Sequence, residues 1–140
     1  MEEETTVTIA ASPDAVWAVL TDVESMPELT ESMTSVEKLD PGPLRVGARV
    51  RIRQPKFPPV VWTVTEYVDN ERFVWEATGP GVRTTGTHEV APAEGGARLR
   101  LHIDQAGLIG GLIGWISRGL TRRYIGMEAA GIKRRAEGAG

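Results

Sequence analysis

The sequence predicts an α+β fold in which a curved antiparallel sheet is covered on one face by a long C-terminal helix. Three observations lead to this fold class. Residues 108–135 have the apolar spacing of a long amphipathic helix. The preceding chain contains short segments, each of about six to ten residues, whose polar and apolar side chains alternate as in half-buried strands. Turn residues separate these segments, so the strands should pair as an antiparallel meander with one face in water.

The predicted elements follow in order along the chain. A first strand is expected at residues 5–11, and Ser12 can then cap a helix that begins at Pro13 and runs to about Leu20. Residues 22–30 form a second short helical piece, so two short helices precede the second strand. The other strands of this seven-stranded sheet are predicted at residues 33–39, 48–54, 60–68, 72–78, 82–91 and 97–105.

The C-terminal helix should cover the sheet with its apolar side. At 100° per residue this side consists of Ile109, Ile113, Ile116, Leu120, Tyr124 and Met127, flanked by Leu112. The opposite side, predicted to face solvent, carries Arg118, Thr121, Arg122 and Glu128. Residues 137–140 are expected to form a frayed tail.

The composition is that of one globular domain over residues 1–140, with 41% hydrophobic and 25% charged residues. The net charge of −3 does not favour a nucleic-acid partner. The absence of cysteine excludes disulfides, thiolate metal sites and cysteine nucleophiles. The N-terminal residues lack the features of a secretory signal, and the longest apolar stretch is shorter than the roughly 20 residues that span a bilayer. We therefore expect a cytoplasmic location.

Four motifs give the chain a family resemblance. They are Ser12-Pro13-Asp14-Ala15-Val16-Trp17 with Asp22, Val64-Thr65-Glu66-Tyr67 leading to Asp69, Thr87-His88-Glu89-Val90 leading to Pro92, and Gly95-Gly96-Ala97-Arg98-Leu99. With the order of the predicted elements, they make the sequence resemble the START-like superfamily, in particular its polyketide cyclase/dehydrase branch of small bacterial proteins. The resemblance covers nearly the whole chain. It departs at Pro27-Glu28-Leu29, where many relatives have a tryptophan.

This resemblance implies a helix-grip fold with an elongated apolar cavity between the curved sheet and the C-terminal helix. Relatives bind lipids, sterols, polyketides, plant hormones or quinones, and some cyclise or dehydrate polyketide chains. Because such different functions share this fold, the fold alone does not indicate which of them the protein has.

Aromatic side chains in the strands are the first candidates for a ligand site. Trp62 and Trp75 have apolar neighbours two residues away, so each can line a cavity or fill a core. His88 shares a strand face with Val90 and should point inward with it. A buried histidine is the best acid/base candidate of the chain, and the alternative is a core histidine with satisfied hydrogen bonds.

On the long helix, Arg123 borders the apolar side. It can hold a ligand carboxylate, or extend along the apolar surface to the edge of the cavity. The hydroxyl of Tyr124 can reach either the cavity or solvent. The complete predicted set of ligand-binding residues is Trp62, Trp75, His88, Ile109, Leu112, Ile113, Ile116, Leu120, Arg123, Tyr124 and Met127.

Glycines at 107, 110, 111 and 114 interrupt the start of the long helix. We expect an irregular helix start that acts as a lid at the cavity mouth, the alternative being close packing on the sheet. The loop around Phe57 would form a second lip. The apolar residues between these glycines, together with Trp115, can also make transient contact with a membrane.

Three functions are compatible with the sequence. The first is binding of a small hydrophobic or amphipathic ligand, such as a lipid, polyketide or quinone-like molecule. The second is an enzyme of the polyketide cyclase/aromatase kind, in which a shaped cavity and one acid/base group, His88, would suffice. The third is a toxin-like or ribosome-associated role through a protein partner. The sequence predicts no metal site and no cofactor, and it does not specify an oligomeric state.

Overall fold

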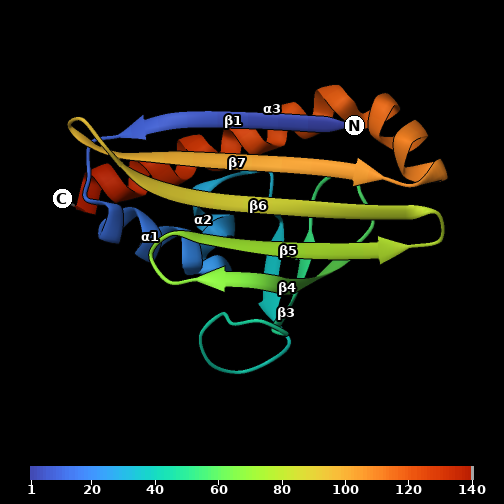
Figure 1. The fold of residues 1–140 in the computed structure, drawn as a ribbon, viewed down its shortest axis with the longest axis horizontal. Coiled ribbons are helices and arrows are strands. Elements are labelled where there is room, and N and C mark those ends of the chain that lie inside the picture. The colour runs from blue at the N-terminus through green and yellow to red at the C-terminus, as the bar shows by residue number, and fades with distance from the viewer. Residues whose placement is uncertain (140) are drawn as a thin grey trace.

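A seven-stranded antiparallel sheet curves around a long C-terminal helix in the computed structural model of the protein (Figure 1). The structure describes the backbone of residues 1–139 and their side chains, except those of residues 110, 111, 113 and 139. The strands follow the spatial order β1-β7-β6-β5-β4-β3-β2. They are β1 (Glu2–Ile9), β2 (Ser35–Lys38), β3 (Arg49–Arg53), β4 (Val60–Val68), β5 (Arg72–Gly79), β6 (Val82–Ala93) and β7 (Gly96–Ala106). The predicted fold class is confirmed.

Three short helical segments connect β1 to β2, namely α1 (Pro13–Thr21), the 3₁₀ turn η1 (Val23–Ser25) and α2 (Met26–Leu29). The α1 helix begins as predicted, because the Ser12 hydroxyl accepts a hydrogen bond from the backbone N–H of Ala15 at 3.1 Å. From α1, Trp17 packs edge-on against Phe73 on the inner face of the sheet.

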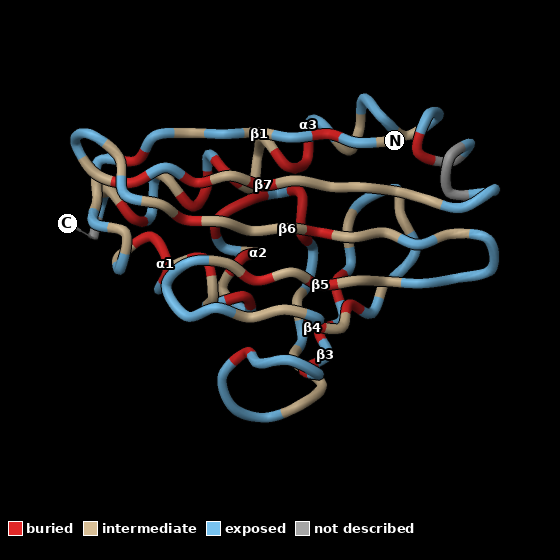
Figure 2. Tube along the Cα trace, in the orientation of Figure 1, coloured by how far each residue is buried: buried red, intermediate tan, exposed pale blue. Residues whose placement is uncertain are grey.

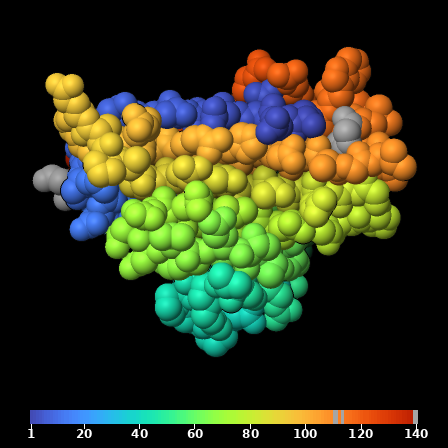
Figure 3. Space-filling model, viewed as in Figure 1, coloured from blue at the N-terminus to red at the C-terminus, as the bar shows by residue number. Residues whose placement is uncertain are grey.

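The first strand begins earlier than predicted, at Glu2, and ends at Ile9. It pairs along its whole length with β7, from Glu2 opposite Asp104 to Ile9 opposite Ala97. The acidic start of the chain is therefore part of the sheet edge. Figure 3 shows the outer face of this sheet, with the start of the C-terminal helix projecting past β1.

The long helix α3 (Leu108–Ala139) packs on the sheet with a different side from the predicted one. Its buried side chains are Tyr124, which belongs to the predicted stripe, and Ile125, Ala129, Ile132 and Ala136, which form a stripe about a third of a turn away. Leu112 and Ile116 of the predicted stripe are 61% and 71% exposed. Figure 2 shows buried positions recurring along the C-terminal half of the helix. The wrong prediction arose because the large apolar residues cluster in the first half, which projects beyond the core.

Polar contacts on both flanks fix the rotation of α3. Glu3 of β1 accepts hydrogen bonds from Arg118 and Arg122, which are exposed as predicted. Glu137, predicted to begin a frayed tail, accepts a hydrogen bond from the backbone N–H of Ala10 at 2.9 Å. Gly131 lies so close to the backbone of Leu29 that a Cβ there would be 2.4 Å from the carbonyl oxygen. These contacts turn Glu128 and Thr121 toward the sheet.

Candidate functional site

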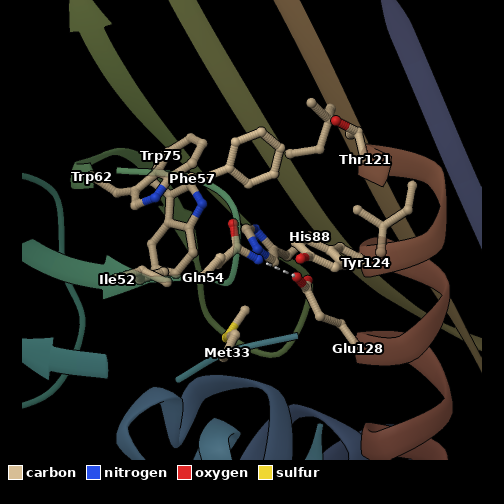
Figure 4. Close-up of a pocket in the computed structure, with 12 residues that line it drawn as sticks. Met33, Ile52, Gln54, Phe57, Trp62, Trp75, His88, Thr121, Tyr124 and Glu128 are labelled. Atoms are coloured by element: carbon tan, nitrogen blue, oxygen red, sulfur yellow. Dashed lines mark hydrogen bonds between the residues drawn. The ribbon is translucent and has the colours of Figure 1, made fainter. Parts of the chain in front are cut away.

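A cavity of about 70 Å³ lies between the inner face of the sheet, the β3–β4 loop and α3 (Figure 4). Its walls come from segments far apart in the sequence, so it exists only in the folded chain. The lining residues are Met33, Ile52, Gln54, Phe57, Trp62, Trp75, His88, Ile103, Thr121, Tyr124, Ile125 and Glu128.

Aromatic rings form the sheet side of the cavity. Trp62 of β4 and Trp75 of β5 stack with ring centroids 5.7 Å apart and an interplanar angle of 30°. Gly86 lies opposite Trp75 in the β5–β6 register. A Cβ at position 86 would be 2.8 Å from the indole Nε1, so glycine provides the room that this indole occupies. The result is a flat aromatic wall suited to planar apolar groups.

His88 continues this wall on β6. Its ring stacks on Phe73, the residue opposite it on β5, with centroids 4.0 Å apart and an interplanar angle of 10°. Its Nδ1 lies 3.2 Å from the carbonyl oxygen of Phe73. A carbonyl oxygen only accepts, so Nδ1 carries the hydrogen and Nε2 is the acceptor of the neutral ring. Burial lowers the pKa of His88 to about 4, opposed by this hydrogen bond, so the ring is neutral at pH 7.

Glu128 of α3 brings a carboxyl group to the same cavity (Figure 4). The side-chain amide of Gln54 donates a hydrogen bond to its Oε1 at 3.4 Å. Burial raises the pKa of Glu128 to about 8, against the smaller lowering by Gln54. Among the described side chains, no arginine or lysine lines the cavity to offset a negative charge. At pH 7 Glu128 is therefore mostly protonated and can donate a hydrogen bond into the cavity.

The β3–β4 loop forms a flap over the cavity and is held to α3 by the Gln54–Glu128 hydrogen bond and by Tyr124. The hydroxyl of Tyr124 donates a hydrogen bond to the carbonyl oxygen of Pro55 at 2.6 Å. The ring of Phe57 meets the Tyr124 ring edge-on, with centroids 5.8 Å apart. Phe57 thus lies at the cavity, as expected for a lip.

A smaller cavity of about 20 Å³ continues toward α1 and α2. Met33, Trp75, His88 and Glu128 line both cavities and so form the partition between them. The walls of the inner cavity are otherwise apolar and include Leu20, Val23, Met26, Phe73, Leu101 and Ile132.

Four of the predicted ligand-binding residues line the main cavity, namely Trp62, Trp75, His88 and Tyr124. The structure places the other predicted residues of α3 elsewhere. Ile109, Leu112, Ile116 and Arg123 are exposed, and Leu120 and Met127 are half-buried outside the cavity lining. The side chain of Ile113 lies outside the described residues.

The described residues at the start of α3 do not line the cavity, to which α3 contributes from Thr121 onward, so the predicted lid has no support in the described part of the chain. Gly107 and Gly114 instead allow close packing. A Cβ at Gly107 would lie 2.5 Å from the carbonyl oxygen of Gly81, and one at Gly114 would lie 2.6 Å from the Cβ of Met1.

Sequence reasoning missed Glu128 and Gln54. A signal for Glu128 is present, because Ile125, Ala129, Ile132 and Ala136 recur at helical spacing and Glu128 lies beside this stripe. No such signal marks Gln54, which follows the last residue of β3 and reaches the cavity through the turn of the loop.

The described part of the chain offers neither a metal cluster nor a membrane-spanning helix. It contains no group of three or more histidine, aspartate or glutamate residues placed to hold a metal ion. None of its helices combines the length and the apolar character needed to cross a bilayer.

Comparisons with known proteins agree with this architecture. Residues 2–137 match the family described as polyketide cyclase / dehydrase and lipid transport. A search of curated proteins found no match. Among solved structures, TTHA0849 from Thermus thermophilus is 21% identical, with a TM-score of 0.79 and coverage of 100% of this chain and 99% of that one. Hypothetical protein jhp0584 from Helicobacter pylori is 13% identical, with a TM-score of 0.79 and coverage of 96% and 86%.

A third similar structure is the di-domain ARO/CYC BexL from the BE-7585A biosynthetic pathway. It is 23% identical, with a TM-score of 0.70, and the match covers 98% of this chain and 46% of BexL. At these identities the three likenesses show a shared fold.

Proposed function

The chain belongs to the polyketide cyclase/dehydrase and lipid transport family, and on that premise we propose that it binds a small apolar or amphipathic molecule between the sheet and α3. The candidate ligands are lipids, polyketides and quinone-like molecules. The observation that carries the proposal is the cavity itself, with stacked aromatic rings on one side and a few convergent polar groups. Such a lining is typical of small-molecule sites.

The volume of the cavity limits what can bind without movement. An apolar cavity of about 150 Å³ holds one benzene molecule. The main cavity, at about 70 Å³, is therefore too small for a lipid or a polyketide in this closed form. Binding of such a ligand requires the cavity to open.

Two features provide for opening. The flap over the cavity is tied to α3 by the short hydrogen bond from Tyr124 to Pro55 and the longer one from Gln54 to Glu128, so breaking these two bonds allows Phe57 to move outward. Met33 stands between the two cavities, and a methionine side chain adapts its shape readily. Rotation of Met33 would join the cavities into the elongated space that the family resemblance implies.

Native mass spectrometry of the gently purified protein, with and without added fatty acid, naphthoquinone and phenolic ketone, tests this proposal. The wild-type chain of 15.2 kDa should carry a defined small-molecule adduct. Thr121→Phe places a ring in the cavity and should abolish the adduct, whereas Leu112→Phe changes an exposed position and should retain it. Thermal melting establishes that both variants are folded. An adduct that persists in Thr121→Phe would place the ligand outside the cavity.

A cyclase/aromatase-type reaction is a second candidate, and the pair His88 and Glu128 favours it. A carboxyl group with a pKa of about 8 and a neutral imidazole face the same apolar space, so one can donate and the other accept a proton near neutral pH. Turnover of a poly-β-ketone substrate should then fall by about 10²-fold or more in His88→Ala and in Glu128→Gln. Unchanged turnover in both variants would exclude this role.

We further propose transient membrane contact through the start of α3. Leu108, Leu112, Trp115 and Ile116 form an exposed apolar row there. Trp115→Ser should weaken co-sedimentation with phospholipid vesicles, while Val46→Ser, at another exposed apolar position, should not. Equal sedimentation of the two variants would count against the contact.

A further inference from the structure

The hydrogen-bonding groups of the cavity are only partly used within the protein. Nδ1 of His88 is engaged with Phe73, and one carboxyl oxygen of Glu128 accepts from Gln54. Within the described part of the chain, Nε2 of His88 and the second oxygen of Glu128 have no hydrogen-bond partner. Both residues line the cavity, so these two atoms are available to a ligand.

The two available groups differ in kind. Nε2 of His88 can only accept a hydrogen, because the Phe73 carbonyl fixes the hydrogen on Nδ1. The protonated carboxyl of Glu128 can donate one, because its Oε1 already accepts from the Gln54 amide and no cation among the described lining residues favours its ionised form. A ligand that satisfies both must offer one donor and one acceptor.

We propose that His88 and Glu128 form a recognition pair for a neutral, planar ligand that carries a hydroxyl and a carbonyl group, as in a phenolic ketone or an enolised diketone. The ligand hydroxyl donates to Nε2 of His88, and its carbonyl oxygen accepts from the carboxyl of Glu128. This inference rests on the proposed function, since it names the ligand class of the same cavity.

The same arrangement selects against carboxylate ligands. A fatty-acid or benzoate head group brings a negative charge, and the described residues that line the cavity include no arginine or lysine to pair with it. The carboxyl of Glu128 offers one hydrogen bond but no compensating charge. The stacked pairs Trp62–Trp75 and Phe73–His88 add a preference for a flat ligand skeleton.

Matched one-ring probes test the pair, because they are the smallest ligands of this class and require the least opening of the cavity. The set is meta-hydroxyacetophenone, acetophenone, meta-ethylphenol, ethylbenzene and benzoate, with affinities measured by isothermal titration calorimetry at pH 6.5. Each of the two polar groups should tighten binding about fivefold relative to ethylbenzene, as expected for one buried hydrogen bond. Benzoate should bind more weakly than acetophenone.

Variants of Glu128 and His88 test which residue is responsible for the gain in affinity from each polar group of the ligand. Glu128→Leu should remove the gain from the ketone and keep the gain from the hydroxyl, whereas His88→Phe should do the reverse. Glu128→Gln retains an N–H donor and should restore the ketone gain. Thermal melting and retained ethylbenzene binding show that each variant keeps the cavity.

The outcomes separate this inference from the proposed function. If ethylbenzene binds and the polar groups add nothing, or if both gains survive in Glu128→Leu and His88→Phe, the recognition pair is refuted while the cavity remains a ligand site. If benzoate binds as tightly as acetophenone, the selection for neutral ligands is refuted. If none of the probes binds and native mass spectrometry shows no adduct, the proposed function fails as well.

Discussion

Replacing Glu128 by glutamine should change how the stability of this protein depends on pH. Glutamine keeps the size of the side chain and its contact with Gln54 but cannot ionise. The carboxyl of Glu128 has a pKa of about 8 in the folded chain, because burial raises it from 4.5. Above pH 4.5 the unfolded chain therefore releases a proton that the folded chain keeps, so stability decreases as the pH rises toward 8.

His88 acts in the opposite direction over part of this range. Burial lowers its pKa from 6.5 to about 4, so the unfolded chain binds a proton that the folded chain does not, and stability increases as the pH rises from 4 to 6.5. Each group contributes about 1.4 kcal/mol per pH unit within its window. Between pH 4.5 and 6.5 the two contributions nearly cancel.

Only the Glu128 contribution remains between pH 6.5 and 8. It should lower the free energy of unfolding of the wild-type chain by about 1–2 kcal/mol over this interval, the smaller value applying if water enters the cavity. In Glu128→Gln this loss should be absent. The variant should therefore gain stability relative to the wild type as the pH rises.

Urea unfolding followed by tryptophan fluorescence at pH 6.5 and 8 measures this difference. Glu94→Gln is the matched control, because Glu94 is exposed in the β6–β7 turn and should lose as much stability as the wild type. Parallel losses in the wild type and in Glu128→Gln would refute the reasoning, since Glu128 would then ionise as freely in the folded chain as in the unfolded one.

Three further predictions concern the packing and flap of the site and the ionic contacts at the sheet edge. Gly86→Ala should cost about 1–3 kcal/mol in urea unfolding and alter tryptophan emission, because the added Cβ displaces Trp75; an unchanged spectrum would contradict the tight fit. Tyr124→Phe should cost about 1 kcal/mol and speed amide exchange in the flap, because the bond to Pro55 is lost; unaltered exchange there would show that the flap is held otherwise. Glu3, whose pKa is lowered to about 2 by hydrogen bonds from two arginines of α3, should stabilise the fold above pH 4.5 and cease to do so as the pH falls through 2. Glu3→Gln lacks this carboxylate, so acid unfolding followed by circular dichroism should show a smaller loss of stability in the variant than in the wild type as the pH falls from 4.5 to 2. An equal loss in both proteins would contradict the assignment.

One side of α3 contributes residues both to the core and to the lining of the cavity. Ile125 and Ile132 are buried, while Thr121 and Glu128 line the cavity on the same side of the helix. The arginine contacts to Glu3 hold this side toward the sheet. Loss of these edge contacts would therefore allow α3 to rotate and would move Thr121 and Glu128 in the cavity lining.

Several properties follow from the sequence alone. Alternation of polar and apolar residues determines the strands, and β4 was predicted with its bounds at Val60 and Val68 because the alternation ends at clear turn residues. The Ser12-Pro13 pair determines the start of α1 through capping. Trp62, Trp75 and His88 were predicted to point inward, since side-chain direction in a strand has a period of two.

The tertiary structure decided the side of α3 that faces the core, and with it the chemistry of the cavity. Local periodicity favoured Ile109, Leu112 and Ile116, but the contacts of Glu3 and Gly131 with distant segments fix a different rotation. That rotation places Glu128 in the cavity, and burial there raises its pKa. The hydrogen position on His88 likewise depends on a carbonyl of the neighbouring strand. Burial and cross-strand contacts are non-local, which is why residue spacing could indicate the fold but not these protonation states.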